Sequence, residues 1–171
     1  MVSQTSSQVL VVVPESDQVV TPAQEVELPM RLQISRIGVD APIQNVGLAA
    51  DGSMDVPKNP FDTGWYELGP RPGEMGSAVI AGHVDSPTGD AGVFADLDNL
   101  TIGDIIIVEN EGMSLSFRVR EIRIYPAGAD ATEIFTSIDD KAHLNLITCN
   151  GTWDTNTNQY TDRLVIFTDK E

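Results

Sequence analysis

Short apolar runs separated by turn-forming residues are the feature that most limits how this chain can fold. The 14 glycines and 10 prolines are spread along the 171 residues, which favours many turns over long helices. From Arg31 onward the apolar residues recur in segments of strand length, and about eight such segments can be counted. The pattern predicts an all-β protein, a closed eight-stranded β-barrel with one or two short helices.

Individual elements can be placed from the pattern of apolar and turn-forming residues. Strands are expected at residues 32–37 and 41–46. Residues 57–69 contain many strand- and helix-breaking residues, so we expect an ordered loop that is pinned by Phe61 and Trp65. We expect the two aromatic rings to pack in the core, in preference to lining a substrate groove.

A helix and a hairpin are predicted in the second half. Val93, Leu97 and Leu100 recur at helical spacing, which indicates the one credible helix. Strands at 104–109 and 113–125 form a hairpin, and a change of phase in the second strand predicts a bulge near Arg120 and Glu121.

The N-terminal residues differ from the rest. Residues 1–29 contain four acids, no Lys or Arg and no sustained periodicity, so we expect a flexible tether ahead of a catalytic domain at 30–171. No stretch approaches the ~20 apolar residues of a membrane helix. We therefore expect that a membrane anchor of the natural protein has been removed, with residues 1–29 as its stalk.

Charge excludes one class of partner. The chain has 26 acidic and 10 basic residues, a formal charge of −16, which repels nucleic acid phosphates and anionic lipids. We expect no nucleic acid partner and a monomer with a solvated acidic surface.

Three chemically capable side chains are expected at strand boundaries. Cys149, the only cysteine, ends one apolar run, His83 ends another, and Arg163 begins a third. If residues 144–149 and 163–168 pair as an antiparallel hairpin, Cys149 and Arg163 lie close together. The 13-residue segment 150–162 between them is then a long polar loop that could wall a substrate cleft.

These side chains could carry out nucleophilic acyl transfer. A cysteine nucleophile needs a neighbouring base or cation, which His83 could supply, and Arg163 could stabilise an oxyanion. Each residue alone also has an ordinary structural interpretation. Cys149 could fill the core, His83 could be structural, and Arg163 could form a surface ion pair with Asp162.

Taken together, these residues resemble the sortase family. Leu146-Ile-Thr-Cys149 is similar to the sequence around the sortase nucleophile, and Ala81-Gly-His83 is similar to its histidine motif. Tyr160-Thr-Asp-Arg163-Leu-Val-Ile-Phe167 completes the set, with intervals of 66 residues from His83 to Cys149 and 14 from Cys149 to Arg163. The resemblance extends from about residue 32 to residue 167. Among the classes of the family, the chain looks most like class F or class E.

The resemblance implies a cysteine transpeptidase that anchors surface proteins to the bacterial cell wall, on the outer face of the plasma membrane. Cys149 would attack an LPXTG-like sorting signal between Thr and Gly, and His83 would protonate the departing amine. Arg163 would position the substrate and support the oxyanion, and Thr148 would contact the substrate or oxyanion. An amine from a peptidoglycan precursor or a pilin lysine would resolve the thioacyl enzyme.

Other candidate residues are weaker. Residues 154–162 place oxygen ligands at alternate positions, as calcium loops do, but Gln159 and Val165 stand where the Gly and Glu of such a loop belong. We therefore expect no cofactor, and calcium stimulation is disfavoured. His143 is expected about 20 Å from Cys149, and Asp85 is a turn residue more readily than a group that orients His83.

Two alternatives to a transpeptidase are open on the residues alone. A cysteine hydrolase would use the same Cys149 and His83 with water as the final acceptor. A non-enzymatic extracellular β-domain would bind its partner through residues 150–162 and leave Cys149 buried.

Overall fold

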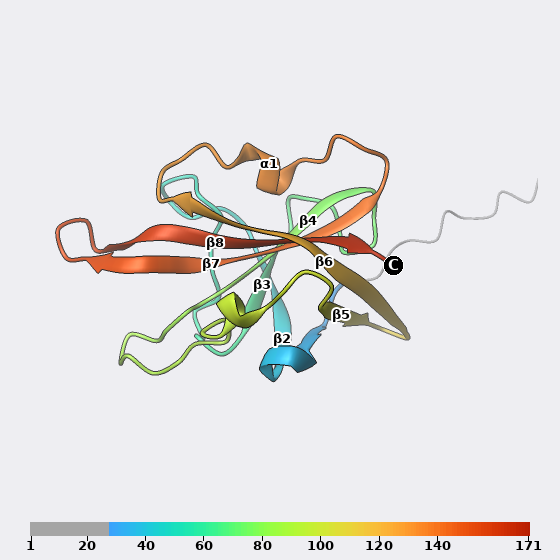
Figure 1. Ribbon diagram of the computed structural model, residues 1–171, viewed down its shortest axis with the longest axis horizontal. Coiled ribbons are helices and arrows are strands. Elements are labelled where there is room, and N and C mark those ends of the chain that lie inside the picture. The colour runs from blue at the N-terminus through green and yellow to red at the C-terminus, as the bar shows by residue number, and fades with distance from the viewer. Residues whose placement is uncertain (1–27) are drawn as a thin grey trace, which may run out of the picture.

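A closed β-barrel forms the body of the protein in the computed structural model, which describes residues 28–171 (Figure 1). Its eight strands within these residues are β1 (Arg31–Ile34), β2 (Val39–Val46), β3 (Thr63–Tyr66), β4 (Gly76–Gly82), β5 (Ile105–Asn110), β6 (Met113–Pro126), β7 (Ala142–Asp154) and β8 (Gln159–Lys170). The order around the barrel is β1-β2-β3-β4-β7-β8-β6-β5, and β5 closes it against β1. The predicted eight-stranded barrel is confirmed.

The barrel interior is built from alternating side chains. In β5, Ile106 and Val108 are fully buried, whereas their neighbours along the strand are only partly covered. Leu144, Leu146, Leu164 and Ile166 fill the same core from β7 and β8. This period of two is the pattern expected when one face of each strand lines the core.

Strand β4 is apolar on both faces because it is covered on both. Ala78 and Ile80 point into the barrel core, while Val79 belongs to a second cluster with Ile134, Val165 and Phe167. Ile134 comes from α1 (Thr132–Phe135), which lies over the outer face of the sheet. Parallel pairing of β4 with β7 places both strands in the middle of this covered region (Figure 1).

The predicted hairpin of β5 and β6 and the bulge in β6 are both confirmed. The two strands pair antiparallel from Ile105 opposite Arg118 to Asn110 opposite Met113. Against β8, the register of β6 shifts between Val119 and Glu121. The extra residue explains the change of phase, because two residues on a bulged strand face one on its partner.

The prediction of a loop at 57–69 is wrong for residues 63–66. Residues Thr63–Tyr66 form β3, which pairs parallel with β2 and antiparallel with β4. Gly64 permits this close pairing, because a Cβ there would lie 2.8 Å from a Val46 methyl group. Trp65 is in the core as predicted, but Phe61 is exposed and pins nothing.

The helix prediction is also wrong. Only Leu97–Asn99 forms a helical turn, the 3-10 helix η2, and Leu97 and Leu100 are buried from an otherwise irregular segment. A second 3-10 helix, η1 (Ser35–Ile37), takes the place of the end of the first expected strand. The short α1 was not foreseen, because four residues show no helical period.

The last hairpin is longer than predicted, and the 13-residue loop is wrong. Strands β7 and β8 continue past Cys149 and Arg163, so that Trp153 pairs with Tyr160 and Asp154 with Gln159. The turn takes only residues 155–158, with Asn158 at φ 53° in the left-handed region that asparagine tolerates. The strand residues beyond Cys149 and before Arg163 are mostly polar, and for that reason their sequence indicates a loop.

The expected tether at residues 1–29 falls almost wholly on residues 1–27, which lie outside the described part of the chain. The described chain joins the barrel at Met30, whose N–H donates to the carbonyl of Glu109 and whose carbonyl accepts from Ile43. Within residues 28–171 there is no helix with the length and apolar character needed to cross a membrane.

Candidate active site

Cys149 and Arg163 are direct partners across the β7–β8 pair. Directly opposed residues of antiparallel strands project on the same face of a sheet, so the thiol and the guanidinium stem share one face. Because Leu146 and Leu164 point into the barrel, Cys149 and Arg163 lie on its outer face, where Cys149 is half-buried. The predicted proximity is confirmed, and Cys149 is not sealed in the core.

His83 follows directly after β4, next to the same part of β7. The parallel register pairs Ala81 with Ile147, and the hydroxyl of Thr148 donates to the carbonyl of Gly82 at 2.8 Å. Continuing this register by two residues brings His83 alongside Cys149. The topology therefore gathers the three predicted catalytic residues at one end of the β4–β7–β8 sheet.

A backbone carbonyl holds the imidazole of His83. The ring Nε2 lies 2.7 Å from the carbonyl oxygen of Pro57. A carbonyl can only accept, so Nε2 carries a proton and donates it. In the neutral ring Nδ1 is then the basic nitrogen, and this is the atom that can accept a proton from a nucleophile.

The loop after β4 packs tightly on the backbone of His83. Phe94 donates its N–H to the carbonyl of His83 at 2.9 Å, and Gly92 donates to Val84 at 2.9 Å. A Cβ at Gly92 would lie 2.4 Å from the carbonyl oxygen of His83, so only glycine fits there without a shift. The histidine is thus fixed through both its ring and its main chain.

Burial and two charges decide the protonation of Cys149. Burial is the largest effect and raises the pKa of the thiol above its usual value, and the Asp85 carboxylate raises it further. The Arg163 guanidinium lowers that pKa in part. At neutral pH the group is therefore mainly a thiol, and a base must remove its proton before it can attack.

Arg163 is held by backbone carbonyls. Its Nη1 donates to the carbonyl of Asp162 at 2.8 Å and to that of Tyr160 at 3.1 Å. The alternative, an ion pair of Arg163 with the Asp162 carboxylate, is not among the ion pairs of residues 28–171, and that carboxylate accepts the Thr161 hydroxyl. Neutral partners leave the positive charge of Arg163 uncompensated by contact, which suits the stabilisation of a developing anion.

Thr148 is buried, and its hydroxyl is engaged with Gly82. That hydrogen bond ties the end of β7 to the end of β4 and so fixes the separation of Cys149 and His83. Contact of Thr148 with substrate or oxyanion stays a prediction.

Asp85 and Tyr160 are two residues of the site whose pairing the sequence did not reveal. The phenol of Tyr160 on β8 donates to Oδ2 of Asp85 on the loop after β4. This hydrogen bond, together with burial and the negative charge of Asp85, raises the pKa of Tyr160 to about 12. Asp85 was expected as a turn residue. The signal for the pair would have required residues 150–162 to be recognised as strands.

The projecting β7–β8 hairpin and the loop after β4 lie at the same end of the molecule (Figure 1). The ring of Trp153 meets that of Tyr160 edge to face at 5.3 Å between centroids. Trp153 is 49% exposed, so this pair presents an apolar surface beside the three predicted catalytic residues.

The other sequence candidates lie elsewhere or have other partners. His143 sits at the opposite end of β7, with its ring nitrogens on Asp169 and Asp139. In residues 154–162, where a calcium loop was disfavoured, Oδ1 of Asp154 accepts hydrogen bonds from the backbone and side chain of Asn156. In residues 28–171, no three His, Cys, Asp or Glu side chains form a group that could hold a metal ion.

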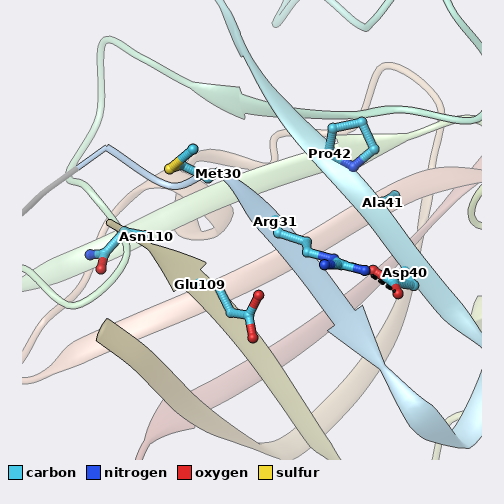
Figure 2. Close-up of a pocket in the computed structure, with 7 residues that line it drawn as sticks. All are labelled: Met30, Arg31, Asp40, Ala41, Pro42, Glu109 and Asn110. Carbon is cyan, nitrogen blue, oxygen red and sulfur yellow. Dashed lines mark hydrogen bonds and ion pairs between the residues drawn. The ribbon is translucent and has the colours of Figure 1, made fainter. Parts of the chain in front are cut away.

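Two surface hollows, each of about 430 Å³, lie away from Cys149. Figure 2 shows the first, where Arg31 of β1 reaches Asp40 of β2 and Glu109 of β5 lies alongside. In the strand order β1 is four strands from β7 in either direction, so this hollow is on the opposite wall of the barrel. The second is lined in part by Trp65, Glu67 and Glu74. We place the candidate site at Cys149, because neither hollow is lined by a Cys, Ser, Thr, Lys or His side chain.

Comparisons with known proteins agree with this architecture. A family model described as a sortase domain matches residues 32–171. A Clostridium perfringens sortase D5 transpeptidase is 22% identical, with a TM-score of 0.63 over 85% of this chain and 79% of that one. Streptococcus agalactiae sortase C1 in complex with MTSET is 26% identical, with a TM-score of 0.65 over 85% and 70% of the two chains.

A third solved structure, sortase C-1 from Actinomyces oris, is 22% identical, with a TM-score of 0.61 over 83% of this chain and 72% of that one. No curated protein sequence matches this chain. The likeness to solved structures is one of fold, whereas the family match spans the barrel from β1 to β8 and includes His83, Cys149 and Arg163.

Proposed function

This chain belongs to the sortase family, and from that premise we propose that it cleaves an LPXTG-like sorting signal between Thr and Gly through a thioacyl intermediate on Cys149. Sortases are cysteine transpeptidases that act on surface proteins at the cell surface. The finer assignment, of substrate and residue roles, is supported chiefly by one observation. Cys149 and Arg163 are strand partners, and β4 ends beside them in His83.

Acylation begins with the thiol. His83 takes the Cys149 proton at Nδ1, since its Nε2 is engaged with Pro57, and the thiolate attacks the carbonyl carbon of the scissile Thr–Gly bond. The raised pKa of the thiol keeps Cys149 protonated at rest, so the nucleophile forms when His83 and substrate are both in place. His83 then returns the proton to the departing glycine amine.

Arg163 stabilises the charge that develops in this step. The carbonyl oxygen becomes an oxyanion in the tetrahedral intermediate, and a guanidinium held in a fixed orientation can donate two hydrogen bonds to it or to the substrate backbone. The two carbonyls that hold Nη1 of Arg163 keep this orientation in the free enzyme.

Resolution of the thioacyl enzyme by an amine completes transpeptidation. The acceptor is an amine of a peptidoglycan precursor or a pilin lysine, and water gives slow hydrolysis as a side reaction. The product is a surface protein joined to the cell wall on the outer face of the bacterial plasma membrane. The reaction requires no cofactor, because acyl transfer needs only the nucleophile, a proton carrier and an oxyanion partner. We retain the assignment to class F or class E as a prediction.

A ligation assay tests the proposed function. The protein is incubated with peptides that carry LPXTG-type motifs and with triglycine amide, and products are identified by mass spectrometry. We expect the acyl part of one motif joined to triglycine, and no product from Cys149→Ala. Cleaved acid alone, even at high amine concentration, would assign a hydrolase instead. If no LPXTG-type peptide reacts although Cys149 can be alkylated, the proposed substrate is wrong.

A further inference from the structure

A carboxylate is fixed beside the thiol, in a place where it opposes formation of the nucleophile. Asp85 lies two residues after His83, and its backbone forms a bridge with Ala91 across the loop. The phenol of Tyr160 donates to Oδ2 of this carboxylate. Within residues 28–171, the carboxylate accepts its hydrogen bond at Oδ2. Its other oxygen, Oδ1, can therefore accept a hydrogen bond from another donor.

The charges around Cys149 show that these groups form one patch. Asp85 and Arg163 shift the pKa of Cys149 in opposite directions, and Cys149 in turn contributes to the raised pKa of Tyr160. The carbonyl of Tyr160 also accepts from Arg163. Tyr160 therefore contacts both the carboxylate, through its phenol, and the guanidinium, through its main chain.

In the first half of the reaction, a negative charge here favours the imidazolium that forms on His83 but disfavours the thiolate and the oxyanion. Asp85 disfavours the thiolate, and the oxyanion of the first step is stabilised by positive charge and hydrogen-bond donors, which a carboxylate does not supply. The second half-reaction has a different need. Its acceptor is an alkyl ammonium in neutral water, and it must approach a site that already contains the cation of Arg163. A carboxylate with a free oxygen offsets that repulsion.

We propose that Asp85, oriented by Tyr160, is the subsite that binds the ammonium group of the acceptor amine next to the thioacyl carbonyl of Cys149. This inference rests on the proposed function and adds to it a residue for recognition of the second substrate. The formal charge of −16 on the whole chain acts in the same direction, because it raises the local concentration of cationic acceptors.

The step balances with groups already present. The bound ammonium loses one proton to water, with His83 as carrier, and the nitrogen lone pair forms the new C–N bond. The C–S bond breaks, and its electron pair returns to the sulfur of Cys149. The second nitrogen proton passes through His83 to that sulfur, which regenerates the thiol. Asp85 stays ionised throughout and only positions the amine.

The test separates binding of the acceptor from acylation. Acyl-enzyme is formed from an LPXTG-type peptide, and its resolution is measured against rising concentrations of triglycine amide, Nα-acetyl-lysine amide or hydroxylamine. The first two are ammonium ions near neutral pH and represent the two sources of amine, whereas hydroxylamine is mainly uncharged. For Asp85→Asn we expect KM for at least one ammonium acceptor to rise about tenfold, with hydroxylamine unchanged.

Matched variants distinguish positioning from folding. Tyr160→Phe releases the carboxylate without removing it, so KM for the ammonium acceptor rises about threefold. Asp90→Asn removes a carboxylate from an exposed part of the same loop, and KM stays as in the wild type. Asn at position 85 can still accept from Tyr160, and Tm confirms that each variant is folded.

Two results overturn the inference. One is an unchanged KM for both ammonium acceptors in Asp85→Asn. The other is an equal loss with hydroxylamine and with the ammonium acceptors, which would mean that Asp85 acts through His83 or the loop. Failure of the proposed function is separate, because in that case the wild type forms no acyl-enzyme at all.

Discussion

One histidine lies at the start of β7, another lies directly after β4 beside the part of β7 that contains Cys149, and the partners of the two rings differ. At the start of the strand, His143 is buried, with Nδ1 2.8 Å from Asp169 and Nε2 2.7 Å from Asp139. At the other end, His83 lies next to Cys149, with Nε2 on the carbonyl of Pro57. One ring is enclosed by carboxylates, and the other has one nitrogen fixed by a neutral acceptor.

This difference assigns the roles of the two residues. Each ring nitrogen of His143 lies within hydrogen-bond distance of a carboxylate, so both nitrogens are used in joining the segment before β7 to the end of β8. His83 has a basic nitrogen for proton transfer and a half-buried thiol as neighbour. We therefore expect the same residue type, at the two ends of one strand pair, to be structural in one case and chemical in the other.

The largest expected effect comes from exchanging each histidine for asparagine. His83→Asn removes the proton carrier, so kcat for ligation falls by about 10³-fold while Tm changes little. His143→Asn breaks the carboxylate contacts, so Tm falls by about 5 °C while kcat stays within about twofold. Ligation kinetics and thermal melts of both variants are the measurement. A large loss of kcat in both, or in neither, breaks the contrast.

Arg163→Lys is expected to lower kcat by about 10²-fold. A lysine keeps the charge, but it cannot reproduce the planar guanidinium that two carbonyls hold in place. Arg31→Lys is the matched control, because Arg31 pairs with Asp40 on the opposite wall of the barrel (Figure 2). Steady-state rates equal to the wild type in Arg163→Lys would show that charge alone suffices.

Gly92→Ala tests how the loop backbone positions His83. A Cβ at Gly92 would lie 2.4 Å from the His83 carbonyl oxygen, so the loop must move, and we expect kcat to fall about tenfold. Gly47→Ala is the control, since a Cβ there would meet only the side chain of Glu67 at an ordinary 3.6 Å. Full activity of Gly92→Ala would mean that the main chain of His83 tolerates displacement.

The smallest effect concerns acid stability at the His143 end. The hydrogen bond from His143 lowers the pKa of Asp139 from its ordinary 3.8 to about 2. A lowered pKa adds stability that is fully present above the ordinary value and is lost as pH falls through the lowered one. Asp139→Asn should therefore have a lower Tm above about pH 4, and the difference should vanish toward pH 2. A constant difference across this range would contradict the assignment.

The sequence predicted the parts of the fold that follow from local periodicity. The β5–β6 hairpin, the bulge after Val119 and the pairing of Cys149 with Arg163 all follow from alternation and turn residues. These features depend on residues near one another in the chain or on a single antiparallel pair. Parallel pairing of β4 with β7 joins distant segments, and the sequence did not predict it.

What the sequence could not predict depends on contacts between distant segments. Thr63–Tyr66 is a strand because β2 and β4 flank it, although its own residues indicate a loop. The Pro57 carbonyl that fixes His83, and the Tyr160 phenol that holds Asp85, are also contacts across the fold. Side-chain partners of this kind require the tertiary structure, whereas the catalytic candidates themselves follow from residue type and spacing.

The most direct test of the account is the intact mass of the protein after rapid acid quenching with an LPXTG-type peptide. We predict an added mass equal to the acyl part of the peptide, mapped to Cys149 by fragmentation and removed by hydroxylamine. Cys149→Ala shows no addition, and His83→Asn accumulates it far more slowly. An addition on any other residue, or none on a folded wild type with an alkylatable thiol, would contradict the account.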